Sequence, residues 1–190
     1  MKKIKLAIFA SGSGSNAKNI INYFYNHPTI EVSFILSNKS DAPIVSWSKE
    51  NNLKVIVLSN EEVNNGELLI QHCIENDIHT IVLAGYLRKI PADFIRHYNE
   101  KIINIHPSLL PKFGGKGMYG VYVHEAVKAA NENQTGITIH YINENFDEGR
   151  FLAQFYCPIS PEDSVEMIQA KVHDLEHNYF PIVIENSIQK

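Results

Sequence analysis

The fold is decided by residues 4–17, Ile4-Lys5-Leu6-Ala7-Ile8-Phe9-Ala10 followed directly by Ser11-Gly12-Ser13-Gly14-Ser15-Asn16-Ala17. The apolar run predicts a buried strand, and the small residues after it predict a tight turn into a helix over residues 16–27 that ends at Pro28. Four further apolar runs predict strands separated by helical stretches: Ile30–Leu36, Lys54–Leu58, Ile78–Ala84 and Ile102–Ile105. Strands that alternate with helices indicate a parallel sheet with right-handed crossovers.

The second half of the chain has a different pattern of predicted strands and helices. Val123–Asn131 has a helical pattern, and residues 137–142 alternate as in a strand with two unlike faces. Phe151–Cys157 follows after a short link, which predicts an antiparallel pair. Ser160-Pro161-Glu162-Asp163 is expected to open the last helix. The fold class is therefore α/β, a Rossmann-like parallel sheet with an antiparallel C-terminal extension and helices on both faces.

Composition fits one domain over residues 1–190, since 44% apolar and 20% charged residues are ordinary for a globular protein. No apolar run approaches the roughly 18 residues needed to cross a bilayer, so no membrane partner is expected. The net charge is −4, from 17 Lys plus Arg and 21 Asp plus Glu, which does not favour a nucleic-acid partner. Cys73 and Cys157 form no CxxC motif, and this suits a cytoplasmic location.

The glycine-rich turn, residues 11–17, offers a site for an anion. Backbone N–H groups at a helix start can cradle a phosphate, and small residues let it approach. The alternative is a tight strand–helix turn without a ligand. Gly12-x-Gly14-x-x-Ala17 also matches the dinucleotide fingerprint, but no carboxylate follows the second strand before Asp41. We therefore expect a phosphate monoester rather than a dinucleotide.

The stretch Asn104-Ile105-His106-Pro107-Ser108-Leu109-Leu110-Pro111 carries the most chemistry. Residues two apart in a strand face the same side, so Asn104 and His106 point together. The run leaves the sheet at Pro107, at a carboxyl end, where open α/β sheets bind ligands. An amide and an imidazole supply two donors for one oxyanion. The alternative is a buried polar pair that satisfies a loop.

This run resembles the signature of the folate-dependent formyltransferases. Similar motifs extend over nearly the whole chain, at Phe9–Asn16, Leu83–Arg88, Asp147–Gly149 and Glu176-His177. The form of His106–Pro111 most resembles the branch that formylates glycinamide ribonucleotide. The resemblance implies a formyltransferase fold and transfer of a formyl group from 10-formyltetrahydrofolate to the amine of glycinamide ribonucleotide in purine biosynthesis, through a tetrahedral intermediate.

The resemblance also implies the residues of the site. The catalytic residues would be Asn104, His106 and Asp147, and the Asp147 carboxylate would favour the imidazolium form of His106. The substrate phosphate would be held by Gly14, Ser15 and Asn16, and the ribose hydroxyls by Glu176. The folate would contact Leu87, Arg88, Lys89, Ile90, Asn143, Glu144, Asn145 and Phe146. No metal is required, and the protein would be a monomer or a homodimer with small-molecule partners.

Parts of the sequence also fit functions other than formyl transfer to glycinamide ribonucleotide. A formyltetrahydrofolate deformylase-like hydrolase would use the same trio, but with a phosphate loop unlike Ser11–Asn16. A relative that formylates tRNA would need a basic surface. His173–His177 spells H-x-x-E-H, an inverted zincin motif, but this turn is expected on the packing face of the last helix. A non-enzymatic nucleotide-binding Rossmann module would keep the glycine turn without needing the trio.

The chain departs from the family pattern in two places. No Lys or Arg lies between Lys54 and Arg88, where relatives often have a basic ligand contact. Residues 112–123 are longer than in familiar members and carry Gly114, Gly115, Gly117 and Gly120. Glycines lower the cost of changing backbone angles. We therefore expect a mobile flap beside the site, with a fixed loop as the alternative.

Overall fold

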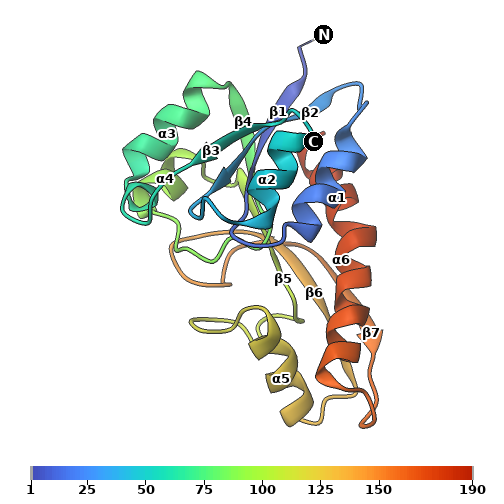
Figure 1. Cartoon of the computed structure of the whole chain (residues 1–190). Helices are drawn as coiled ribbons and strands as arrows, with labels where there is room; N and C mark the ends of the chain where they lie inside the picture. Colours follow the sequence, from blue (N-terminus) through green and yellow to red (C-terminus); the bar gives the residue numbers. More distant parts are fainter. Residues whose placement is uncertain (1, 190) are drawn as a thin grey trace. The chain divides into compact units, whose positions relative to one another are not determined.

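The computed structural model describes residues 2–189 (Figure 1). The chain forms two compact units, Met1–Ile103 and Asn104–Lys190, and strand β5 (Ile102–His106) runs through the boundary. Within residues 2–189, no helix combines the length and the apolar character that a membrane span requires.

The first unit alternates strands with helices, as the apolar runs predict. Its elements are β1 (Ile4–Phe9), α1 (Ser15–Phe24), β2 (Ile30–Ser37), α2 (Pro43–Glu50), β3 (Lys54–Val57), the 3₁₀ turn η1 (Glu62–Asn64), α3 (Gly66–Glu75), β4 (Ile78–Leu83) and α4 (Ala92–His97). All strand pairs are parallel, in the order β3-β2-β1-β4, with the first residues of β5 beside β4. Strand β1 lies in the middle because its residues 6–9 are wholly apolar and fully buried.

Two features of the first unit differ from the prediction. Helix α1 ends at Phe24 rather than at residue 27. The ring Nδ1 of His27 accepts hydrogen bonds from the N–H groups of Thr29 and Ile30, so a side chain closes the turn before β2. Helix α4 was not predicted, because six residues are too few for a periodic pattern to stand out.

The second unit contains the end of β5, α5 (Val121–Ala129), β6 (Gln134–Tyr141), β7 (Phe151–Pro158) and α6 (Val165–Ile188). Strands β6 and β7 pair antiparallel, with Ile137 opposite Phe155. The long helix α6 packs against both strands (Figure 1) and buries Ile168, Val172 and Phe180. A parallel sheet in the N-terminal half and an antiparallel pair in the C-terminal half confirm the predicted fold class.

Two local predictions in the second unit are wrong. Strand β6 does not have two unlike faces, because Thr138 and His140 are as fully buried as their apolar neighbours. Helix α6 begins at Val165, with Ser164 as its N-cap, and not at Ser160. The Asp163 carboxylate accepts a hydrogen bond from the Ser160 N–H at 2.9 Å, which closes residues 160–163 into a separate turn.

Candidate functional site

The glycine-rich turn joins β1 to α1 in the first unit. Its hydroxyl at Ser11 donates to Asn38 Oδ1 at 2.7 Å and accepts from the Leu87 N–H at 3.3 Å. The N-cap residue of α1 is Gly14, which has no side chain to cap the helix. Ser15 and Asn16 are the first two residues of this helix. The helix therefore begins with backbone N–H groups rather than a capping side chain, as an anion site requires.

The structure shows a reason for a glycine at position 14 that the sequence did not reveal. Its φ of 72° lies in the left-handed region, and a Cβ there would come within 2.6 Å of the Ile44 side chain on α2. The fold alone therefore requires a glycine at this position. A substitution of Gly14 would disturb the first unit whether or not a phosphate binds.

The segment that follows β4 contains four of the folate residues implied by the resemblance. The ring of Phe9 on β1 packs edge-on against Tyr86 at 5.5 Å between centroids, which anchors this segment beside the glycine-rich turn. Burial raises the pKa of Tyr86 to about 12. Leu87 is 56% exposed and Lys89 is exposed, whereas Ile90 is buried. Leu87 is thus free to contact a ligand, and Ile90 belongs to the core.

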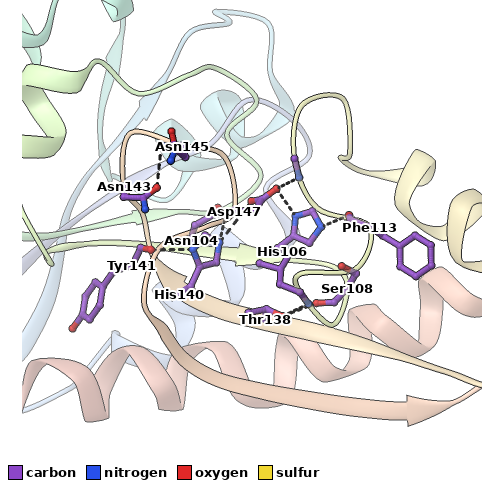
Figure 2. A network of polar contacts seen from close by, with 12 residues as sticks. Asn104, His106, Ser108, Phe113, Thr138, His140, Tyr141, Asn143, Asn145 and Asp147 are labelled. Atoms are coloured by element: carbon purple, nitrogen blue, oxygen red, sulfur yellow. Dashed lines mark hydrogen bonds and ion pairs between the residues drawn. The ribbon is translucent and has the colours of Figure 1, made fainter.

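The three residues of the implied trio come together in the second unit (Figure 2). Asn104 and His106 lie on β5, and Asp147 lies in the loop between β6 and β7. Asp147 Oδ2 is 3.5 Å from His106 Nδ1, and Oδ1 is 3.8 Å from Nε2 of His140. Asn104 Nδ2 is 3.2 Å from the same His140 nitrogen. The buried His140 ring therefore lies between the Asn104 amide and the Asp147 carboxylate, which also faces His106.

His106 is held through its other ring nitrogen. Nε2 is 2.8 Å from the carbonyl oxygen of Phe113. A carbonyl oxygen only accepts hydrogen bonds, so Nε2 carries a proton and donates it. Nδ1 is then the ring atom that faces Asp147 and can exchange a proton without breaking the Phe113 bond.

The base of the glycine-rich segment 112–123 is tied to this cluster. The Gly115 N–H donates to Asp147 Oδ2 at 2.8 Å, and the Phe113 side chain packs against Val127, Ile159 and Ile168. Residues 113–115 are therefore anchored, so any flap begins after Gly115. In that later part Tyr119 and Tyr122 form an edge-on pair, 47% and 53% exposed.

A buried threonine fixes the chain after β5. Thr138 Oγ1 on β6 donates to the Ser108 carbonyl at 2.7 Å and accepts from the Leu110 N–H at 3.0 Å (Figure 2). Gln154 Nε2 on β7 donates to the same hydroxyl oxygen at 2.9 Å. These bonds hold the turn that leaves β5.

His140 is the site residue that sequence reasoning missed. It is completely buried on β6, and its burial lowers its pKa, partly opposed by the Tyr141 carbonyl and the Asp147 carboxylate. A nearby His106 lowers it further. The available signal was the alternation of residues 137–142, which predicts a strand with two unlike faces but does not show that the polar face is buried.

The loop before Asp147 contains the other implied folate residues. Asn143 Oδ1 accepts from the Asn145 N–H at 3.0 Å, and Asn145 Nδ2 donates to Glu148 Oε2 at 2.8 Å. Glu144 is exposed and Phe146 is 46% exposed. The loop is thus braced by its own side chains and leaves an aromatic ring at the surface.

Helix α6 carries Glu176, which is half-buried, between two histidines. The rings of His173 and His177 lie 3.9 Å apart between centroids, and burial lowers the pKa of His177. Within residues 2–189, no group of three or more His, Cys, Asp or Glu side chains is placed to hold a metal ion.

The anchoring of residue 115 by Asp147 can be measured by hydrogen exchange. In D147G the acceptor is lost, while glycine suits the φ of 58° at this position. The Gly115 amide should exchange at least about tenfold faster than in the wild type, the value expected for one lost charge-assisted bond. D147N keeps an oxygen acceptor but loses the charge, so its exchange rate should lie between those of the wild type and D147G. Equal rates in D147G and the wild type would show that the anchor is absent in solution.

Comparison with known proteins places the chain in a family. The family model described as "Formyl transferase" matches residues 4–184. The chain is 36% identical to the chloroplastic phosphoribosylglycinamide formyltransferase of Vigna unguiculata, over 97% of this chain and 61% of that protein. It is 33% identical to the phosphoribosylglycinamide formyltransferase of Bacillus subtilis, over 95% of this chain and 93% of that protein. The chain thus spans less than two thirds of the plant relative and nearly all of the bacterial one.

The structure is similar to solved structures as well. It superimposes on the phosphoribosylglycinamide formyltransferase of Bacillus halodurans with a TM-score of 0.87 and 34% identity, covering 98% of this chain and 96% of that one. The family match runs through both units of the chain, and through every residue of the Asn104, His106 and Asp147 cluster. The chain belongs to the formyl transferase family.

Proposed function

We propose that this protein is a phosphoribosylglycinamide formyltransferase, which transfers the formyl group of 10-formyltetrahydrofolate to the amine of glycinamide ribonucleotide in purine biosynthesis. The observation that carries the proposal is the cluster of Asn104, His106 and Asp147 in a chain that matches the formyl transferase family over residues 4–184. The relatives of Vigna unguiculata and Bacillus subtilis carry this activity in their names.

The reaction needs a stabilised oxyanion. The substrate amine forms a bond to the formyl carbon, and the carbonyl oxygen of the formyl group takes up negative charge. One N–H of the Asn104 amide is directed to His140, which leaves the second N–H to donate to that oxygen. The imidazolium form of His106 provides the second donor.

Proton transfer completes the exchange. The amine loses one proton, and the bond between the formyl carbon and the folate nitrogen breaks as that nitrogen gains one. The imidazolium form of His106 gives its Nδ1 proton to that nitrogen and regains a proton from the amine, while Nε2 stays bonded to the Phe113 carbonyl. Asp147 Oδ2, at 3.5 Å from Nδ1, stabilises the positive charge on the ring during the transfer.

The binding roles follow the family resemblance. Gly14, Ser15 and Asn16 at the start of α1 hold the substrate phosphate, and Glu176 holds the ribose. The segment Leu87–Ile90 and the loop 143–146 hold the folate, with Leu87 and Phe146 offering exposed apolar surface. The whole chain, residues 1–190, acts as one catalytic domain without a metal.

The proposal includes the location and the assembly of the protein. Cys73 and Cys157 are both free, as is usual in a reducing compartment, and this supports the cytoplasm. A monomer or a homodimer would suffice, since every residue of the trio comes from one chain.

The activity is tested by supplying 10-formyltetrahydrofolate with glycinamide ribonucleotide, and with water alone as the control acceptor. We expect the formylated ribonucleotide to accumulate in step with loss of the folate formyl group. Release of formate at the same rate with or without the ribonucleotide would contradict the proposal and favour the deformylase-like hydrolase.

The phosphate site is tested without catalysis, by titrating ribose 5-phosphate into ¹⁵N-labelled protein. The backbone amide signals of Gly14, Ser15 and Asn16 should shift, because the N-cap residue of α1 is a glycine without a capping side chain. The Met167 amide is the control, since the Ser164 hydroxyl already caps α6 there. Equal shifts at both helix starts, or none at α1, would exclude a specific phosphate site.

A further inference from the structure

The hydrogen bonds of His140 determine which of its nitrogens is protonated. Nδ1 lies 2.9 Å from the carbonyl oxygen of Tyr141 (Figure 2). Because that oxygen only accepts, Nδ1 must carry the proton. In a neutral ring the other nitrogen, Nε2, then has a lone pair and acts as an acceptor.

This acceptor faces the Asn104 side chain. Nε2 lies 3.2 Å from Asn104 Nδ2, which donates. If the amide were turned by 180°, its carbonyl oxygen would face the lone pair of Nε2, and two acceptors would repel each other. The Tyr141 carbonyl therefore fixes the proton on His140, and His140 fixes the direction of the Asn104 amide.

The surroundings of His140 keep the ring neutral. It is completely buried, and its burial lowers its pKa. The ionisable groups that face it are His106 on β5 and Asp147 in the β6–β7 loop. Asp147 Oδ1 is 3.8 Å from Nε2, too far for a hydrogen bond, so Asn104 is the nearer partner.

We propose that His140 is a positioning residue that acts through Asn104: its Nδ1-protonated, neutral ring holds the amide with its N–H groups turned to the oxyanion side. The role concerns the proposed formyl transfer and rests on that function. His140 itself does not touch the reacting atoms in this role. A protonated His140 would present an N–H to the Asn104 N–H groups and would favour the opposite, inactive orientation of the amide.

The protonation state is tested first, because it needs no activity. Two-bond ¹H–¹⁵N NMR correlations of the wild type should show that His140 is protonated at Nδ1 and unprotonated at Nε2. In H140L one Asn104 side-chain N–H signal should shift, since its acceptor is gone. A ring protonated at Nε2, or an Asn104 signal unchanged in H140L, would overturn the proposal.

The kcat values of His140 variants then distinguish a positioning role of this residue from a role in packing alone. A glutamine places its terminal amide near the position of Nε2, whereas an asparagine reaches only that of Nδ1. H140Q should retain most of the wild-type kcat, while H140N and H140L lose about tenfold or more, with KM for both substrates unchanged. Equal kcat values for H140Q and H140N would contradict the proposal, since a ring that only fills space gains nothing from an acceptor at Nε2.

A double-mutant cycle gives the strictest comparison. N104A alone should reduce kcat by about 10²–10³, the usual loss for one oxyanion donor. In the N104A background, H140L should cost no more than a further twofold, because the residue that it orients is already missing. Losses that multiply in the double variant would overturn the role of His140.

Failure of the two proposals can be told apart. If the wild type transfers no formyl group to the ribonucleotide, the proposed function fails, while the signals of His140 and Asn104 still decide the orientation of the amide. If transfer is normal but the ring is protonated at Nε2, the proposed function stands and the positioning role fails.

Discussion

The cluster of Asn104, His106 and His140 depends on the contacts of one carboxylate, that of Asp147. One oxygen faces His106 Nδ1 at 3.5 Å and accepts the Gly115 N–H at 2.8 Å, and the other lies 3.8 Å from His140. A single side chain therefore sets the charge around two histidines and anchors the base of a glycine-rich segment. Asp147 adopts a φ of 58°, which aspartate tolerates better than most residues, so the loop supplies the carboxylate at modest conformational cost.

The site relies on backbone groups as much as on side chains. His106 and His140 each donate from one ring nitrogen to a carbonyl, of Phe113 and Tyr141 respectively, and each keeps the other nitrogen for a functional partner. Buried imidazoles without such partners would carry a desolvation cost and an undefined protonation state. The same two bonds place a proton on one defined nitrogen of each ring, so that Nδ1 of His106 and Nε2 of His140 are the nitrogens left for other partners.

Much of the fold could be predicted from the sequence, because each parallel strand is a short apolar run between helical stretches. The limits of β1 to β5 fall within one residue of those runs. The Asn104 and His106 pair was also identifiable, since a period of two and a strand end are local features.

The features that the sequence did not predict depend on contacts between distant parts of the chain, which local patterns do not contain. Thr138 and His140 form the polar face of an alternating strand, and their hydroxyl and ring are satisfied by Ser108 and Asn104, thirty or more residues away. Gly14 is required by Ile44, a neighbour from another helix. Likewise, the start of α6 was misplaced because Asp163 closes a turn of its own instead of joining the helix.

We propose that the negative charge of Asp147, and not only its hydrogen bond to Gly115, supports catalysis by His106. The most direct measurement is the single-turnover rate of formyl transfer in D147N, which keeps an oxygen acceptor for Gly115 but removes the charge. We expect the D147N rate to be lower than the wild-type rate by about 10²-fold or more, as for loss of an acid–base partner, with the segment 113–115 still anchored. A D147N rate within twofold of the wild type would contradict it.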